Sequence, residues 1–374
     1  MLRELRAGED AGRSLVVLHP VDVCLDGLYS ELEARSANRT WYAVDLRELQ
    51  GRPGTLAQRL LDHFGWEHSA DGADWALLVD RLVGFGLAIR HRDQSPDARE
   101  LADFIGKFAT ASARYGPHHR PVLAYAGPFG SISPVPIDDV AVMCVYWWGY
   151  VSPLDTLVVV DEVLSASRVV GDSEAIAELA AWDLELAASL AADWGAEAEA
   201  QALLGAYRAA VPEEQGLLRE AAAASSMERY AGPPTDLLDA WARGSVNWWG
   251  ERALVHIGRY PPCDFEAAVR RRIWRGQVAA VLPYVELARE RLAGWLDSRS
   301  HLVGDRWRYK DMVALEVGPL EKVFHESAGL RRAVPQYELA RLLRQTRHRL
   351  AHLKHVNRDE LVRIQDLMSA GLFT

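Results

Sequence analysis

The chain has 374 residues, of which 49% are hydrophobic and 25% are charged, and its net charge is −10. This length and composition predict a globular protein with two or three domains, and the charge argues against a protein that coats nucleic acid nonspecifically. No apolar run approaches the roughly 20 residues of a spanning helix. The start MLRELRAGEDAGR lacks the apolar core of a secretory signal, so we expect no membrane partner and a cytoplasmic location.

Residues 12–165 alternate short apolar runs with amphipathic stretches. The runs are rich in strand-forming residues and cover residues 14–18, 40–44, 86–89 and 121–126. Helices are predicted between them, over residues 25–35, 56–64 and 97–115. Such alternation predicts an α/β domain with a mostly parallel sheet. The apolar runs 140–150 and 157–160 are candidates for further strands or for a small appended unit.

The first predicted strand raises the question of a nucleotide site. The sequence that follows it, HPVDVCLDG, has neither the lysine nor the hydroxyl residue of the GxxxxGK[ST] loop that binds phosphates. We therefore expect no bound cofactor. One alternative stays open, because Asp161 and Glu162 follow the apolar run 157–160 in the way that magnesium-binding acids end a strand in a nucleotide-dependent switch.

Residues 166–260 are predicted to form a helical linker region. From Ser173 the sequence is rich in alanine and leucine, with apolar residues at three- and four-residue spacing. Prolines 261 and 262 mark the best candidate for a domain boundary. The two WWG triplets, at residues 147–149 and 248–250, have different surroundings, and burial explains their tryptophans better than stacking on nucleic-acid bases.

Residues 264–370 are predicted to form an all-α bundle of four helices with short connections. The first helix, residues 273–296, keeps one apolar face and contains Pro283, which should kink or interrupt it. The other helices are expected over residues 311–325, 335–355 and 359–369, the last with Asn357 as its cap.

On a helical wheel, the helix predicted over residues 335–355 separates a core face from a basic face. The core face comprises Leu339, Leu342, Leu343, Thr346, Leu350 and Leu353. His348, His352 and His355 lie opposite, and Arg347 lies between the two faces. Three interpretations stay open: a solvated basic face, a metal site built on the histidines, and acid–base catalysis on RNA.

A basic run surrounds these histidines. Between Arg331 and Arg358, eight residues are Arg or Lys and only Glu338 is acidic. A local concentration of positive charge of this kind makes a binding site for phosphates possible within an acidic protein.

The segment Arg347-His348-Arg349-Leu350-Ala351-His352 resembles the R-polar-x-x-x-H signature of HEPN domains, with Arg347, His348 and His352 at its defining positions. The resemblance implies a metal-independent endoribonuclease that acts on RNA as a homodimer. In such an enzyme His352 would activate the ribose 2′-hydroxyl, Arg347 would stabilise the pentacoordinate phosphorus, and His348 would orient these groups.

The resemblance extends over about residues 264–369. As in that family, an upstream helix carries acids near an arginine, here Glu286, Arg289 and Glu290. Many HEPN-like domains only bind, so a non-catalytic adaptor that uses the bundle for dimerisation or partner binding stays open.

The layout of residues 12–165 is similar to that of the degenerate STAND-type NTPase modules of bacterial conflict systems, which keep the α/β core and lose the phosphate-binding loop. This resemblance implies an inactive, P-loop NTPase-like module that controls the C-terminal bundle. It further implies a role in antiphage defence, with other defence-system proteins as partners.

Overall fold

The computed structural model describes residues 2–21, 23, 26–35, 39–67, 74–91, 97–136, 138, 140–164, 168–194, 217–224, 232–371 and 373. The chain divides into two compact units. Unit 1 comprises Met1–Tyr150 and Arg219–Leu254, and unit 2 comprises Val151–Leu218 and Val255–Thr374. This division cuts across the predicted ranges 12–165, 166–260 and 264–370, because residues 166–260 contribute to both units.

Unit 1 is built on a five-stranded sheet in the order β2-β3-β4-β1-β5, with every pair parallel. The predicted parallel sheet is therefore confirmed. Its strands are β1 (Ser14–His19), β2 (Thr40–Asp45), β3 (Phe85–Arg90), β4 (Val122–Pro128) and β5 (Val142–Tyr146). All six residues of β1 are buried, as expected for a central parallel strand covered on both faces.

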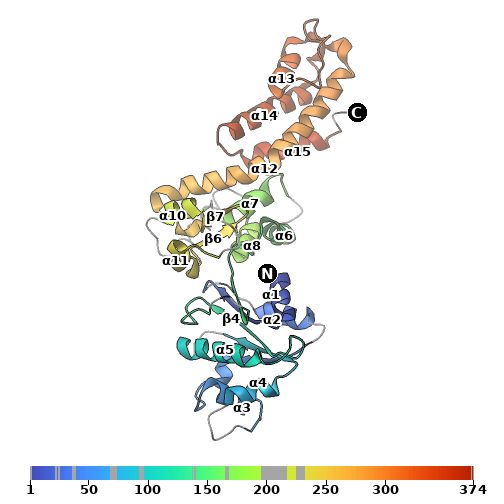
Figure 1. Cartoon of the computed structure of the whole chain (residues 1–374). Helices are drawn as coiled ribbons and strands as arrows, with labels where there is room; N and C mark the ends of the chain where they lie inside the picture. Colours follow the sequence, from blue (N-terminus) through green and yellow to red (C-terminus); the bar gives the residue numbers. More distant parts are fainter. Residues whose placement is uncertain are drawn as a thin grey trace. The chain divides into compact units, whose positions relative to one another are not determined.

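Helices cover both faces of this sheet. Figure 1 shows α1 (Leu2–Asp10) and α2 (Asp26–Arg35) on one face, and α3 (Leu56–His63), α4 (Asp74–Arg81) and α5 (Ala98–Ser112) on the other. A 3-10 helix, η1 (Leu46–Leu49), follows β2. Leu5 of α1 and Tyr29 of α2 pack on Leu15 and Val17 of β1 in one apolar core. The result is a three-layer α/β/α arrangement.

The chain returns to unit 1 at Arg219, shortly after residues 195–216, which lie outside the described part of the chain. The returning segment contains α10 (Leu217–Ala224), η3 (Thr235–Leu237), α11 (Leu238–Ala242) and the paired strands β6 (Val246–Trp249) and β7 (Arg252–Val255). The two WWG triplets meet here, since the rings of Trp148 and Trp248 lie 6.5 Å apart and the Gly149 N–H donates to Asn247 Oδ1 at 3.0 Å. Trp148, Trp248 and Trp249 are buried, as predicted.

Unit 2 is helical. Its first part holds α6 (Pro153–Val163), α7 (Asp172–Ala180), α8 (Leu184–Ala192) and η4 (Ile257–Arg259), and its second part holds η5 (Ser300–Leu302), α13 (Val317–Glu326), η6 (Ala328–Leu330), α14 (Val334–Ala351) and α15 (Arg358–Ser369). The strand predicted over residues 157–160 is wrong. Ser152 and Asp155 form a capping box and Pro153 occupies the first turn, so this run is the middle of α6.

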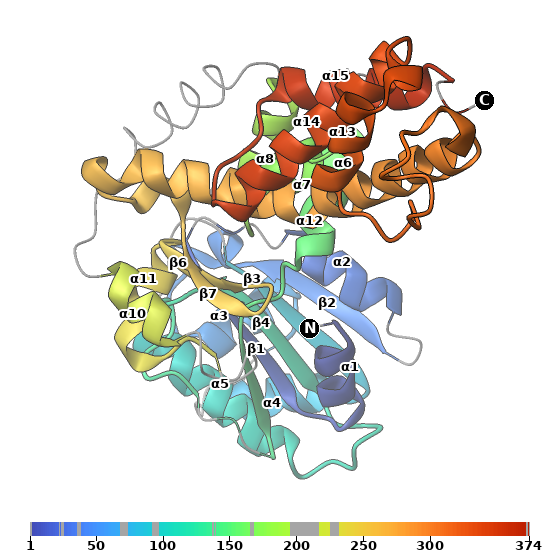
Figure 2. The same cartoon turned by 90° about the horizontal axis from the view of Figure 1, so that it is seen from above.

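The long helix α12 (Pro262–Asp297) joins the two parts of unit 2. Val269 and Ile273 in its first half pack on α7 and α8, whereas Val285 and Leu292 in its second half pack on the cores beneath α13, α14 and α15. Figure 2 shows these helices arranged along α12. The helix continues through Pro283, so of the two predicted alternatives, a kink or a break, the break does not occur.

Two predicted helix boundaries in the bundle are also wrong. The helix expected over residues 311–325 begins only at Val317, because the Asp311 carboxylate accepts from the Val313 N–H and holds a turn. The helix expected over residues 335–355 ends at Ala351. By contrast, Asn357 caps α15 as predicted, since its side chain accepts from the Asp359 N–H.

Among the helices that the structure describes, none has both the length and the apolar character needed to cross a membrane.

Candidate functional site

The helix α14 carries the two faces that the wheel predicts. Its buried residues are Leu339, Ala340, Leu342, Leu343, Thr346 and Leu350. His348 and His352 are exposed, which confirms that they point away from the core of their own bundle, and Arg347, predicted to lie between the two faces, is exposed as well. Leu353 was predicted to lie on the core face, and this is wrong, since 70% of its surface is exposed.

The reason is the way in which α14 ends. The N–H of Leu353 donates to the Leu350 carbonyl at 3.3 Å, and the N–H of Lys354 donates to the Arg349 carbonyl at 3.0 Å. This pair of bonds is a Schellman motif with Leu353 in the left-handed conformation, at φ 57°. The turn takes Leu353 off the core face and makes His352 the cap residue of the helix.

Two side chains of α12 fix this helix end. The indole N–H of Trp274 donates to the Leu350 carbonyl at 2.8 Å. The Gln277 amide accepts from the Val356 N–H at 2.7 Å and donates to the Val356 carbonyl at 2.9 Å. Sequence reasoning missed both roles, although a polar residue in register with buried Ile273 and Val281 was a signal at Gln277. The backbone that carries His352 is thus held from both sides.

Replacing Leu353 by glycine is expected to raise the free energy of unfolding by about 1 kcal/mol, because a side chain in the left-handed conformation costs about 1–2 kcal/mol that glycine avoids. The side chain of Leu353 is mostly exposed, so little packing is lost. Urea unfolding measures the change. The control is Leu353→Ala, which keeps the Cβ atom; a gain in that variant equal to the gain in Leu353→Gly would contradict the explanation.

His348 and His352 lie against each other at the end of α14. Their ring centroids are 4.3 Å apart and the ring planes meet at 62°. Both side chains are exposed, whereas His355 is half-buried. Within the described part of the chain, no group of three or more His, Cys, Asp or Glu side chains is placed to hold a metal ion. The arrangement is a pair of imidazole groups that solvent or a ligand can reach.

Arg347 has a partner that the sequence did not indicate. Its guanidinium Nη1 pairs with Oε2 of Glu316, the residue that precedes α13. Both side chains are largely exposed, so this ion pair contributes little to stability and a competing anion can reach the arginine. No local pattern in the sequence marks Glu316, because it lies 31 positions before Arg347.

Glu286 and Arg289 of α12 form a second ion pair, which lies on the helix that holds the chain before Glu316. Arg289 Nη2 lies 2.6 Å from Glu286 Oε1 and 3.9 Å from Glu290 Oε1. Arg289 Nη1 also donates to the carbonyls of Val313, at 2.7 Å, and Leu315, at 3.1 Å. The buried arginine therefore holds the loop that leads to Glu316. Of the three residues predicted on this helix, Arg289 is buried and supports the site from within, whereas Glu286 and Glu290 are exposed.

Three other arginines of the basic run, Arg344, Arg349 and Arg358, have acidic partners too. Arg344 Nε lies 2.8 Å from Glu321 Oε2, and Arg349 Nη1 lies 2.9 Å from Glu360 Oε2. Arg358 Nε lies 3.3 Å from Asp172 Oδ2. Each acid comes from a different helix, which the sequence run alone did not reveal. The positive potential of this face is therefore lower than the run predicts.

Mild acid is expected to destabilise the bundle through Glu286 and Glu338. Hydrogen bonds from Arg289 and from Arg363 are the largest causes that lower the pKa of these two carboxyl groups. A carboxyl with a lowered pKa binds fewer protons when folded, so its stabilisation is complete above the ordinary glutamate pKa and is lost as the pH falls through that value toward the folded-state pKa.

Urea unfolding followed by circular dichroism, between about pH 7 and about pH 3, measures this loss. We expect a smaller loss in a Glu286→Gln/Glu338→Gln double variant than in the wild type. Equal losses would show that these two carboxyl groups do not contribute.

Unit 1 contains a second candidate position, at the carboxyl ends of its strands. Open parallel sheets bind ligands there, where the connections of neighbouring strands diverge, which in this sheet is beside β1. Trp241 occupies this position. Its ring lies 5.8 Å from Phe129 and 5.7 Å from Tyr146, and its N–H donates to the Trp147 carbonyl at 3.2 Å. A fully buried tryptophan thus lies in the crevice at this edge of the sheet.

The second arrangement considered for a nucleotide site, with Asp161 and Glu162 at the end of a strand, does not form. Asp161 and Glu162 lie in α6, not at the end of a strand. Asp161 accepts from the Ser173 hydroxyl at 2.7 Å and pairs with Arg168 at 3.0 Å. Asp161, the first acid after the run 157–160, therefore joins α6 to α7 within the helical unit.

No family model and no curated protein matches this chain. Among solved structures, a chain from the structure of Drosophila ORC bound to DNA is similar, with 12% sequence identity and a TM-score of 0.31, over 100% of this chain and 71% of that chain.

Proposed function

We propose that this protein is a HEPN-type endoribonuclease of a bacterial antiphage defence system, which cuts RNA without a metal ion. The observation that carries the proposal is the exposed contact between His348 and His352, with Arg347 beside them at the end of α14. Two imidazoles and a guanidinium on a rigid, solvent-facing helix end supply the groups that proton transfer and phosphate binding require.

The proposed reaction assigns one role to each residue. His352 takes the proton of a ribose 2′-hydroxyl, whose oxygen attacks the adjacent phosphorus and displaces the 5′-oxygen of the next nucleotide, and this leaving oxygen takes up a proton from water. Arg347 stabilises the negative charge on the phosphorus oxygens, and His348 orients the reacting groups. The products carry a cyclic phosphate and a 5′-hydroxyl. A homodimer completes the site, because Arg347 and His352 leave their helix in different directions.

RNA would replace Glu316 as the partner of Arg347. A phosphate and a carboxylate offer the guanidinium the same kind of anionic oxygens, and a phosphate binds it through two parallel hydrogen bonds. The exposed ion pair is weak enough to exchange.

Unit 1 is proposed to be an inactive NTPase-like module that regulates the bundle. Its parallel sheet with helices on both faces fits that layout, and the phosphate-binding loop is missing after β1. Trp241 in the crevice supports regulation by a binding partner in place of nucleotide hydrolysis.

Cleavage of RNA in EDTA tests the proposal. Purified protein, alone or in its activated complex, is expected to cut a single-stranded RNA in the presence of the chelator, and mass spectrometry should find a cyclic phosphate on the fragments. A 2′-deoxy nucleotide at the cleaved position should block the reaction. Cleavage that disappears with EDTA, or fragments with a 5′-phosphate, would contradict this mechanism.

The second candidate is a non-catalytic adaptor whose bundle binds a second copy or another protein. The pairing of Arg344, Arg347 and Arg349 with acids of their own unit favours it, since paired arginines attract RNA less. An adaptor would form stable oligomers that survive substitution of Arg347 and His352, and would cut no RNA under any activating condition.

A further inference from the structure

One stripe of α14 faces directly away from the core of the bundle. Its members recur at three- and four-residue spacing and are Arg341, Gln345, His348 and His352, all of them exposed. At about 100° per residue they lie within about 60° of one another, opposite the buried Leu350. At about 1.5 Å per residue, this outer stripe is about 16 Å long. It extends the imidazole pair by about two helical turns toward the start of α14.

The side chains of the outer stripe are available to a ligand. Within the residues that the structure describes, none of them forms a hydrogen bond or an ion pair. Glu338 is the only acid of α14, and its two carboxylate oxygens already accept from Arg363, at 2.9 Å and 2.7 Å. Arg341 acts on that carboxylate only through a weaker attraction. An anion from solution can therefore use the charge of Arg341.

Ion pairs border the outer stripe on both sides. They join Arg344 to Glu321, Arg347 to Glu316, Arg349 to Glu360 and Glu338 to Arg363. The first two lie toward α13 and the last two toward α15, because the partner of each α14 residue belongs to, or directly precedes, that helix. Among the arginines of α14, Arg341 is thus the one without an ion pair in the described part of the chain. Unbalanced positive charge on α14 lies along the stripe and not beside it.

This arrangement suits one strand of RNA better than a duplex. A row of cationic and hydrogen-bonding groups along a line can follow the phosphates of a single strand. A duplex is wider, and its second strand would meet bordering carboxylates such as that of Glu360, which would repel its phosphates. Gln345 offers both a donor and an acceptor, so it can contact a phosphate or the edge of a base.

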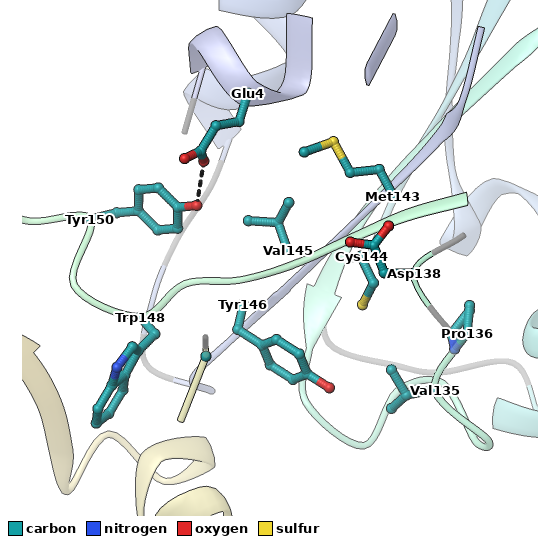
Figure 3. A pocket seen from close by; sticks show the side chains of 11 residues that line it. Glu4, Val135, Pro136, Asp138, Met143, Cys144, Val145, Tyr146, Trp148 and Tyr150 are labelled. Carbon is teal, nitrogen blue, oxygen red and sulfur yellow. Dashed lines mark hydrogen bonds between the residues drawn. The ribbon is translucent and has the colours of Figure 1, made fainter. Parts of the chain in front are cut away.

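The pocket beside β5 of unit 1 does not offer such a site. Its volume is 560 Å³, and Figure 3 shows the carboxylates of Glu4 and Asp138 among its lining side chains. In the part of the chain that the structure describes, the lining includes no Lys, Arg or His. No cationic side chain of this lining can pair with a phosphate, so the outer stripe is the better candidate for RNA.

We propose that a single strand of RNA lies along the outer stripe, from the cleaved bond at His348 and His352 to a phosphate bound by Arg341, with Gln345 in contact between them. This rests on the proposed ribonuclease function and adds the form of its substrate. The strand continues past the cleaved bond on one side only, because α14 ends at Ala351 and no further turn of the stripe follows His352. In the homodimer each protomer carries its own stripe.

Cleavage kinetics in EDTA, with RNAs extended on the 5′ side or on the 3′ side of the cleaved bond, test the proposal. The shortest substrate is a dinucleoside monophosphate, which Arg341→Ala should cut as fast as the wild type does. Extension on one side should raise kcat/KM of the wild type about tenfold, the typical gain from one charge-assisted contact. Arg341→Ala should lose this gain through a higher KM, with kcat unchanged.

Binding without cleavage is measured with a long RNA that has a 2′-deoxy nucleotide at the cleaved position. Fluorescence anisotropy should show about tenfold weaker binding to Arg341→Ala, and a salt dependence reduced by about 0.7 in the slope of log K against log salt, since one phosphate contact is lost. Gln345→Glu places a carboxylate in the stripe and should weaken binding as well. The matched control is Arg332→Ala, which removes an exposed arginine that precedes α14 and should bind like the wild type.

Several results would overturn the proposal. These are equal binding by Arg341→Ala and the wild type, equal gains from extension on either side, a changed oligomeric mass of Arg341→Ala, and displacement of the RNA by polyglutamate at the same concentration of charge. Failure of the wild type to cut any RNA would instead refute the ribonuclease function. The anisotropy comparison would then still decide whether the outer stripe binds RNA.

Discussion

Replacement of Gly276 by alanine is expected to lower the free energy of unfolding of unit 2 by about 3 kcal/mol. Gly276 lies where α12 crosses α7, and a Cβ atom there would overlap the carbonyl of Glu174 and lie 2.5 Å from the Ala175 nitrogen. These are backbone atoms of a helix and cannot rotate away as a flexible side chain would. The two helices would have to separate, which would loosen the core around Ile176 and Ile273.

The matched control is Gly294→Ala in the same helix. A Cβ atom at Gly294 would meet nothing within 4 Å, and the position is exposed. Alanine is the better helix former, so this variant should gain about 1 kcal/mol. Urea unfolding of both variants, followed by circular dichroism, gives the comparison. If the two substitutions change stability in the same direction, the close approach of α7 does not determine the effect.

The strands of unit 1 were predictable because burial on both faces leaves a clear pattern. The runs at residues 14–18 and 121–126 became β1 and β4 with boundaries close to those expected. The run at residues 157–160 has the same composition but lies in α6. Four apolar residues fit a strand or a buried helix equally well, and the deciding signal was outside the run, in Ser152, Pro153 and Asp155.

The candidate site was predictable only in part. The helical repeat correctly placed His348 and His352 on the exposed face, whereas it had placed Arg347, which is exposed, between the two faces. It could not place the end of α14, because the left-handed residue there is Leu353 and the usual glycine signal is absent. Nor could it supply Glu316, whose position depends on a loop that Arg289 holds from another helix. Contacts between distant segments decide the charge of this surface.

The largest expected effect on activity is the loss of RNA cleavage in Arg347→Ala and His352→Ala. Removing a positioned acid–base group or a charge-stabilising donor typically costs a factor of about 10²–10⁴ in rate, so each variant should cut RNA at least about a hundredfold more slowly. The matched controls are Arg344→Ala, which removes an arginine one turn earlier with a similar acidic partner, and His325→Ala, which removes an exposed histidine from the last turn of α13. Both controls should cleave like the wild type.

The same variants test whether two chains form one site. In a dimer of Arg347→Ala with His352→Ala, one protomer keeps His352 and its partner keeps Arg347, so a site shared between two helices would contain one intact pair. Mixing the two purified variants under conditions that allow subunit exchange should therefore restore part of the cleavage that each has lost. A site contained in one chain would stay inactive in the mixture, because neither chain has both groups. Cleavage by the single variants at the wild-type rate would remove Arg347 and His352 from the mechanism and leave the adaptor as the function of this bundle.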